Sequence, residues 1–230
     1  MPDFRGYLFD LDGTLVDTAP DLNAALNHAL TSNGLQPVDE ALTRHWVGHG
    51  ARVLVTQALA HQQGDGNGST DPTATADLDA LLNGFIDHYQ SHIADRSTIY
   101  PAVEETLDAL RAGGSRLAVV TNKRTVLTEA LLEILGLNTY FDVVVCGDTA
   151  ALPKPAADPA IYACRALDLP AHQVLFVGDS ATDVACARAA GCAIVCVADG
   201  YNHGTPAHEL GADAVITSFR ELLTAGTPSS

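Results

Sequence analysis

Short apolar runs, separated by longer stretches of mixed polarity, recur along most of the chain. Each run is too short for a helix and rich in β-branched side chains, which is typical of strands buried on both faces of a parallel sheet. The predicted strands are residues 7–9, 117–120, 143–146, 174–177, 193–197 and 214–216.

Helical patterns lie between these runs, and most of them end near a glycine, as helix C-termini prefer. The predicted helices are residues 103–112, 126–135, 160–167 and 183–190. Strands that alternate with helices indicate the α/β class. We therefore predict a doubly wound, mostly parallel sheet of the Rossmann-like kind.

Residues 17–96 interrupt this alternation, because they contain helical patterns and no convincing strand. The helical patterns are residues 21–31, 39–46, 52–61 and 78–92. We predict a small all-helical cap domain over residues 17–96, inserted after the first strand of a core formed by residues 1–16 and 97–230. Residues 62–77 are rich in Gly, Asp, Ser and Thr and predict a mobile loop between two cap helices.

Composition and charge narrow the possible functions. Of the 230 residues, 47% are hydrophobic and 17% charged, which indicates a folded core. The formal net charge of −16 disfavours binding to nucleic acid or to an anionic membrane surface. No apolar stretch approaches the ~20 residues of a membrane span, and the N-terminus does not resemble a signal peptide. We expect a soluble, cytoplasmic monomer or homodimer whose five cysteines are reduced thiols of the core.

Polar side chains that could take part in catalysis or metal binding follow several of the predicted strands. They are Asp10 and Asp12, Thr121 and Asn122, Lys154, and Asp179 and Asp183. Open α/β sheets bind their ligands at the carboxyl ends of the strands, so these groups are expected to meet at one edge.

Together these groups suit the hydrolysis of a phosphate monoester, one of the slowest biological reactions without a catalyst. A carboxylate can attack phosphorus and form an aspartyl-phosphate, if a divalent cation screens the two anions. Oxygen ligands from Asp10, Asp12 and Asp179 suit Mg²⁺. If Asp12 binds the metal through its carbonyl, its side chain is free to act as general acid and base. Thr121 and Asn122 can then hydrogen-bond the phosphoryl oxygens.

The segments 10–17, 120–123, 154–155 and 178–183 resemble the four ordered motifs of the haloacid dehalogenase-like hydrolase superfamily. The resemblance implies that Asp10 is the nucleophile and a metal ligand. Asp12 is then the acid and base and binds metal through its carbonyl. Thr121 and Lys154 hold phosphate, Asp179 binds Mg²⁺, and Asp183 supports the metal site indirectly or through water. One departure from the family is an alanine at position 157, where members often carry a second proline.

Two further segments, 46–54 and 200–204, are similar to the subfamily of bacterial phosphoglycolate phosphatases. This similarity implies a small phosphorylated metabolite, 2-phosphoglycolate, as substrate. Thr14, Gly50 and Arg52 are further candidates for substrate contacts. Arg52 could pair with a substrate carboxylate or simply lie on the surface. Asp17 could form a hydrogen bond near the site or help to start the first cap helix, and the second interpretation is favoured.

Other functions remain open at this point. A phosphatase acting on many small metabolites would carry the same motifs. A β-phosphoglucomutase-like phosphosugar mutase would use the same aspartyl-phosphate but return the phosphoryl group to sugar. A phospho-accepting signalling receiver also has a doubly wound sheet with an acceptor Asp and a Lys, but it lacks a helical insert and places the acceptor on a later strand.

Overall fold

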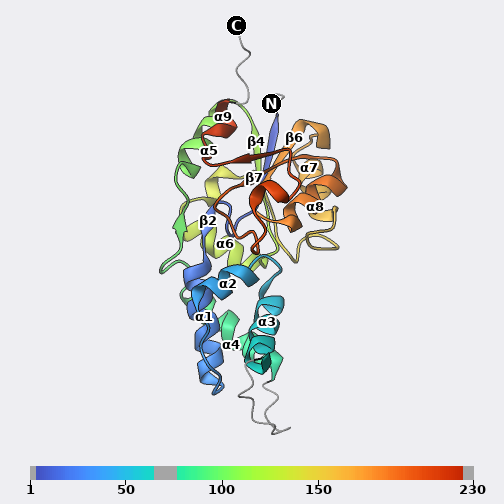
Figure 1. Cartoon of the computed structure of the whole chain (residues 1–230). Coiled ribbons are helices and arrows are strands. Elements are labelled where there is room, and N and C mark those ends of the chain that lie inside the picture. Colours follow the sequence, from blue (N-terminus) through green and yellow to red (C-terminus); the bar gives the residue numbers. More distant parts are fainter. Residues whose placement is uncertain (1–3, 65–76, 225–230) are drawn as a thin grey trace.

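A computed structural model describes residues 4–64 and 77–224. A six-stranded sheet forms its centre, in the order β5-β4-β1-β6-β7-β8 (Figure 1). All neighbouring pairs in it are parallel. Its strands are β1 (Gly6–Phe9), β4 (Arg116–Val120), β5 (Val143–Val145), β6 (Val174–Gly178), β7 (Ala193–Val197) and β8 (Ala214–Ile216). The predicted fold class is confirmed.

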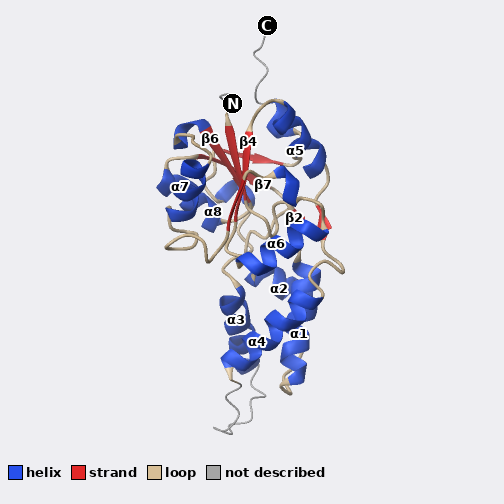
Figure 2. Cartoon of the chain, turned by 180° about the vertical axis from the view of Figure 1, so that it is seen from behind, coloured by secondary structure: helices blue, strands red, loops and turns tan. Residues whose placement is uncertain are grey.

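Helices cover both faces of this sheet, as Figure 2 shows from the opposite side. They are α5 (Val103–Ala112), α6 (Thr125–Ile134), α7 (Asp158–Ala166), α8 (Ala181–Ala190) and the short α9 (Glu221–Thr224). Successive side chains of β1 point to opposite faces of the sheet, and each face is covered by its own layer of helices. Tyr7 and Phe9 belong to the buried cluster that includes α5 and α6, whereas Leu8 belongs to the cluster that includes α7 and α8.

Four helices occupy the segment in which the sequence shows no strand pattern. They are α1 (Ala19–Ser32), α2 (Glu40–Trp46), α3 (Ala51–Gly64) and α4 (Leu78–Ser91). They form a layer below the sheet in Figure 1. Helix α3 continues to Gly64, past its predicted end, and residues 65–76 of the predicted loop lie outside the described residues. The division of the chain into two domains stays a prediction.

The chain passes between the sheet and these helices through a small ribbon that the sequence analysis missed. Strands β2 (Val16–Asp17) and β3 (Thr98–Ile99) pair antiparallel, so both connections run side by side. Runs of two residues carry too little periodicity to be recognised.

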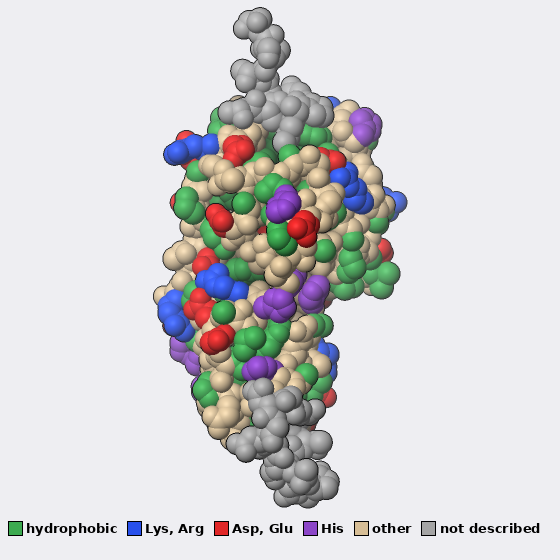
Figure 3. Space-filling view, in the orientation of Figure 1, with side chains coloured by type: hydrophobic (Ala, Val, Ile, Leu, Met, Phe, Trp, Pro, Cys, Tyr) green, Lys and Arg blue, Asp and Glu red, His purple; other side chains and the backbone are tan. Residues whose placement is uncertain are grey.

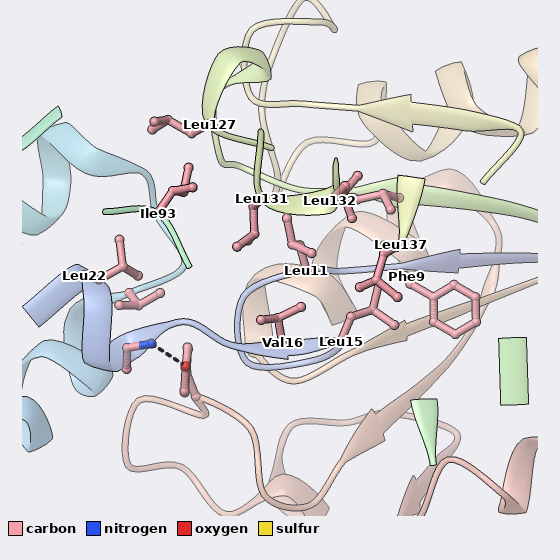
Figure 4. Packing of buried hydrophobic residues seen from close by; sticks show 14 of the residues in the cluster. Phe9, Leu11, Leu15, Val16, Leu22, Ile93, Leu127, Leu131, Leu132 and Leu137 are labelled. Atoms are coloured by element: carbon pink, nitrogen blue, oxygen red, sulfur yellow. Dashed lines mark hydrogen bonds between the residues drawn. The ribbon is translucent and has the colours of Figure 1, made fainter. Parts of the chain in front are cut away.

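Apolar side chains next to this ribbon join the two parts of the molecule. Leu11, Leu15 and Val16, in the segment after β1, lie in one cluster with Leu22 of the cap helix α1 and Leu131 of the core helix α6 (Figure 4). All five side chains are almost fully buried. The segment that carries the candidate nucleophile is therefore held from both ends by packed side chains.

The remaining expectations concern the cysteines and membrane spans. All five cysteines are buried, as expected for core thiols. Among the described residues, no helix combines the length and apolar character that a membrane crossing requires.

Candidate active site

Asp10 lies at the end of the central strand β1 and is 6% exposed. Its main-chain N–H donates to the carbonyl of Val177 on β6, and its Oδ1 accepts a hydrogen bond of 2.7 Å from the N–H of Leu11. A turn follows at Gly13, where φ is +86°. A side chain at that position would collide with the carboxylate of Asp179, so the turn brings two strand ends into close approach.

Lys154 supplies the positive charge beside Asp10. Its Nζ lies 2.7 Å from Oδ1 of Asp10 and 2.7 Å from Oδ1 of Asp183, and the lysine side chain is 1% exposed. Against the effect of burial, these two carboxylates raise the pKa of Lys154 above its ordinary value. The ammonium is therefore charged and links Asp10 to α8.

Three carboxylates gather around this lysine. One oxygen from each of Asp10, Asp179 and Asp183 lies within 4.8 Å of the others, and all three residues are buried. Burial, with the charge of Asp183, raises the pKa of Asp10 to about 7, although Lys154 opposes the shift. Burial, with the charges of Asp183 and Asp10, raises the pKa of Asp179 well above its ordinary value. Burial also acts to raise the pKa of Asp183, but Lys154 and the Ser180 hydroxyl hold it low.

This cluster fits a hard divalent cation, because buried carboxylates that repel one another are stabilised by a positive ion with oxygen ligands. Two glycines leave room for the Asp179 carboxylate in this cluster. A side chain at position 200, like one at Gly13, would overlap that carboxylate. Asp179 is further fixed by the N–H of Tyr201, which donates to its Oδ2.

Asp183 makes two separate sets of contacts. It is an N-terminal acid of α8, where its Oδ2 accepts hydrogen bonds from the N–H and the hydroxyl of Ser180. Its other oxygen binds Lys154 and lies in the carboxylate cluster itself.

The side chain of Asp12 lies outside the carboxylate cluster. Its Oδ1 accepts hydrogen bonds of 2.6 Å from Nζ of Lys123 and 2.6 Å from the Thr18 hydroxyl. This placement leaves the main-chain carbonyl as the group that Asp12 could offer to a metal, as the family resemblance implies. That carbonyl contact stays a prediction.

Thr121 and Asn122 follow β4. The Thr121 hydroxyl accepts a hydrogen bond of 3.1 Å from the N–H of Lys123 and lines the pocket in front of Asp10. The Asn122 side chain is fully engaged elsewhere: Nδ2 donates to the carbonyls of Gly48 and Lys154, and Oδ1 accepts from the N–H of Lys154. The Asn122 amide group thus holds the main chain of Lys154 and of the 48–50 turn, and because Asn122 also lines the pocket in front of Asp10, its contact with a substrate stays a prediction.

A pocket of about 540 Å³, including open solvent, separates the strand ends from the cap helices. Its lining includes Asp10, Asp12, Thr121 and Gly50, so the structure brings these predicted residues together. Leu54, Phe85 and Tyr89 of α3 and α4 form part of its wall from the cap side.

Two predicted substrate contacts lie elsewhere. Arg52 lies on the surface of α3 and pairs with Asp79 of α4 at 2.7 Å, with both side chains more than half exposed. Thr14 lines a different pocket together with Tyr100 and Asp199. Neither belongs to the lining of the pocket in front of Asp10.

The expected role of Asp17 in starting the first cap helix is wrong. Thr18 occupies the N-cap position of α1, and Asp17 lies in β2. Its two oxygens bind Arg44 of α2 at 2.8 Å and the hydroxyl of Tyr201 at 2.5 Å. The Tyr201 hydroxyl also accepts from the N–H of Ala19, so Tyr201 connects the Asp179 carboxylate to the beginning of the cap.

Histidines also gather where the cap meets the core, as the purple side chains in Figure 3 show. His49, from the turn after α2, stacks on His203 with ring centroids 4.9 Å apart, and His203 Nδ1 lies 2.7 Å from the carbonyl of His45. Sequence patterns give no sign of these contacts, because they depend on segments far apart in the chain.

Comparison with known proteins agrees with this geometry. A model of the haloacid dehalogenase-like hydrolase family matches residues 7–197. A phosphoglycolate phosphatase of Yersinia pestis is 40% identical over 227 residues, which cover 98% of this chain and 94% of that protein. A phosphoglycolate phosphatase of Escherichia coli (strain K12) is 39% identical over 239 residues, covering 99% of this chain and 95% of that protein.

Solved structures show the same architecture. The crystal structure of a predicted phosphoglycolate phosphatase from Haemophilus somnus 129PT superposes with a TM-score of 0.90 at 35% identity, covering 99% of this chain and 100% of that one. CbbY from Rhodobacter sphaeroides, solved in complex with phosphate, superposes with a TM-score of 0.78 at 25% identity, covering 95% of this chain and 96% of that one.

Proposed function

The chain belongs to the haloacid dehalogenase-like hydrolase family, and we propose that it is a Mg²⁺-dependent phosphatase that hydrolyses 2-phosphoglycolate to glycolate and phosphate. The observation that carries the chemistry is the buried Asp10 carboxylate, 2.7 Å from Lys154 and within the cluster of Asp179 and Asp183. The substrate is proposed from the names of relatives about 40% identical over nearly the whole chain.

The reaction takes place in two displacements. A carboxylate oxygen of Asp10 forms a bond to phosphorus while the bond from phosphorus to the ester oxygen breaks, and Asp12 gives its proton to the departing glycolate oxygen. A water then attacks the phosphorus of the aspartyl-phosphate and gives a proton to Asp12. Inorganic phosphate leaves, and the Asp10 carboxylate and the Asp12 acid are restored.

Residues around Asp10 prepare it for the first displacement. Lys154 favours the ionised form of the nucleophile against burial and fixes its position with a hydrogen bond. Asn122 holds Lys154 through the main chain on both sides of its α-carbon. The Thr121 hydroxyl lines the pocket where the phosphoryl oxygens would lie.

The metal would be held by carboxylate oxygens of Asp10 and Asp179, by the carbonyl of Asp12, and with support from Asp183. When bound, Mg²⁺ supplies positive charge that offsets repulsion between the Asp10 carboxylate and the phosphoryl group. The cap helices form the opposite wall of the pocket and limit access of bulk water to the reacting groups.

Phosphate release from a panel of esters tests this proposal. The panel holds 2-phosphoglycolate, several sugar phosphates, pyrophosphate and p-nitrophenyl phosphate, each measured with Mg²⁺ and with EDTA. We expect kcat/KM for 2-phosphoglycolate at least about tenfold above the others, a discrimination of about 1.4 kcal/mol. Activity should disappear with EDTA and in Asp10→Asn.

Two outcomes would overturn parts of the proposal. Similar rates on many esters would replace the substrate assignment with a broad phosphatase. Formation of glucose 6-phosphate from β-glucose 1-phosphate, without release of phosphate, would identify a mutase.

A further inference from the structure

Lys123 places a buried ammonium group in the pocket in front of Asp12. Its side chain is 4% exposed, and Nζ lies 2.6 Å from Oδ1 of Asp12. A lysine ammonium paired with a carboxyl group stays charged at neutral pH, so Lys123 brings a positive charge to the pocket. The bond to Asp12 engages one of the three N–H donors of the ammonium. Lys123 therefore has donors left for a second acceptor.

Tyr89 of α4 approaches the same ammonium from the cap. The Lys123 Nζ lies 4.8 Å from the centre of its ring, and the tyrosine is fully buried while lining the pocket. Within the described residues the Tyr89 hydroxyl has no hydrogen-bond partner of good geometry, and Lys123 is the charged group that interacts with it most closely. A buried hydroxyl without a partner costs about 1–3 kcal/mol, so such groups are normally satisfied. Burial raises the pKa of Tyr89 to about 12, so the hydroxyl keeps its proton.

Much of the remaining wall of this pocket is apolar. This part is formed by the side chains of Leu22, Val47, Leu54, Phe85 and Leu127. An anionic group that enters beside Asp12 would find side-chain hydrogen-bond donors on Lys123 and Tyr89.

The cationic side chains of Arg124 and Arg52 are less suited than Lys123 to bind an anion in this pocket. Arg124 also lines the pocket, but its side chain is 58% exposed and Nε lies 3.9 Å from Oδ2 of Asp148. Arg52 is outside the lining and engaged by Asp79.

We propose that Lys123 and Tyr89 form the subsite that binds the carboxylate of 2-phosphoglycolate. This inference rests on the proposed function. In that substrate a single methylene carbon separates the carboxylate from the ester oxygen that Asp12 protonates. A cation in direct contact with Asp12 is therefore within reach of the carboxylate once the ester oxygen lies against Asp12. Because Lys123 comes from the core and Tyr89 from the cap, the carboxylate would also connect the two parts of the molecule.

The subsite explains how a small substrate can be selected. A pocket built to hydrogen-bond one group discriminates strongly against an analogue that lacks it, because its own buried groups then stay unpaired. An ester with an uncharged leaving group would leave the Lys123 ammonium and the Tyr89 hydroxyl without the acceptor.

Steady-state kinetics on the full chain with Mg²⁺ test the subsite. The two substrates are 2-phosphoglycolate and 2-hydroxyethyl phosphate, which carries CH₂OH in place of the carboxylate. The readout is the ratio of their kcat/KM values, since damage to Asp12 or to the phosphate site lowers both rates alike. Lys123→Met should reduce this ratio by about 10- to 150-fold, the range for a hydrogen bond to a charged group. Lys123→Arg should restore part of it.

Tyr89→Phe is the sharper variant, because it removes only a hydroxyl that has no hydrogen-bond partner of good geometry within the described residues. It should reduce the ratio by about 2- to 12-fold, the range for one neutral hydrogen bond. Its melting temperature should equal or exceed that of the wild type, which separates a binding role from a structural one.

The proposal is overturned if both Lys123→Met and Tyr89→Phe keep the wild-type ratio. It is also overturned if Arg52→Met or Arg124→Met removes the preference instead. A wild-type protein that hydrolyses phosphate esters without preferring 2-phosphoglycolate would contradict the substrate assignment itself. That failure is visible before any variant is made.

Discussion

Lys154→Met tests the electrostatic arrangement of the site most severely. Lys154 is 3% exposed and binds two carboxylates, Asp10 and Asp183, at 2.7 Å each. Methionine keeps the length of the side chain and removes the charge. The substitution therefore leaves buried carboxylates of the cluster without their counter-charge in the metal-free protein.

The magnitude follows from burial and from pH. Removing one partner of a buried ion pair typically costs about 3–5 kcal/mol of stability. The Asp183 carboxylate can escape this penalty by taking up a proton, and from its ordinary pKa of 3.8 that uptake costs about 5 kcal/mol at pH 7.5 and about 2 kcal/mol at pH 5.5. The loss of stability should thus be about 3–5 kcal/mol at pH 7.5 and about 2 kcal/mol or less at pH 5.5.

Urea unfolding in EDTA at the two pH values measures this effect. Arg188→Met is a matched control, since it removes a cation from a surface pair with Asp213 in which both side chains are 45% exposed. Such pairs contribute about 1 kcal/mol or less. The kcat of Lys154→Met should fall about 10²–10³-fold, as for loss of one donor in a preorganised site. Equal unfolding free energies for wild type and Lys154→Met at pH 7.5 would refute the reasoning.

Three further predictions concern the same site. Gly200→Ala should weaken Mg²⁺ binding, measured by calorimetry, because its side chain would overlap the Asp179 carboxylate; unchanged affinity would show that this approach is not required. The metal-free protein should lose stability as pH rises from about 4 to about 7. Burial is the main cause, because it raises the folded-state pKa of Asp10 from 3.8 to about 7. In this pH range the folded protein therefore holds a proton that the unfolded chain has released. Mg²⁺ replaces that proton, so it should raise the melting temperature more at pH 8 than at pH 5, and an equal rise would contradict this linkage. Tyr201→Phe removes the hydroxyl bound to Asp17 and should cost about 1–3 kcal/mol in urea unfolding with little change in Mg²⁺ affinity, since the main-chain bond to Asp179 remains.

Much of the fold and the centre of the site could be predicted from the sequence, because both depend on local patterns. Buried parallel strands are short apolar runs, and the residues that follow them must lie at one sheet edge. Asp10 and Asp179 follow the adjacent strands β1 and β6, which explains why residues so far apart in the chain share one carboxylate cluster.

Contacts that depend on how the cap is placed could not be predicted. The Tyr89 side chain has an ordinary helical position in the sequence, and only the fold brings it over Lys123. Arg52 follows the glycine turn that lines the pocket, yet its place on α3 directs it to Asp79. Asp17 is a plausible helix-starting residue by local rules, but Arg44 and Tyr201, which are distant in sequence, bind both of its oxygens.

The most direct test of the central claim is chemical trapping of the phosphorylated enzyme. The protein is mixed with Mg²⁺ and 2-phosphoglycolate, stopped during turnover and treated with borohydride, which reduces an aspartyl-phosphate to homoserine. Peptide mass spectrometry then reads position 10. We expect homoserine at that position in the presence of 2-phosphoglycolate and aspartate without it. Rapid turnover with position 10 unmodified, or modification at another carboxylate, would contradict Asp10 as the nucleophile.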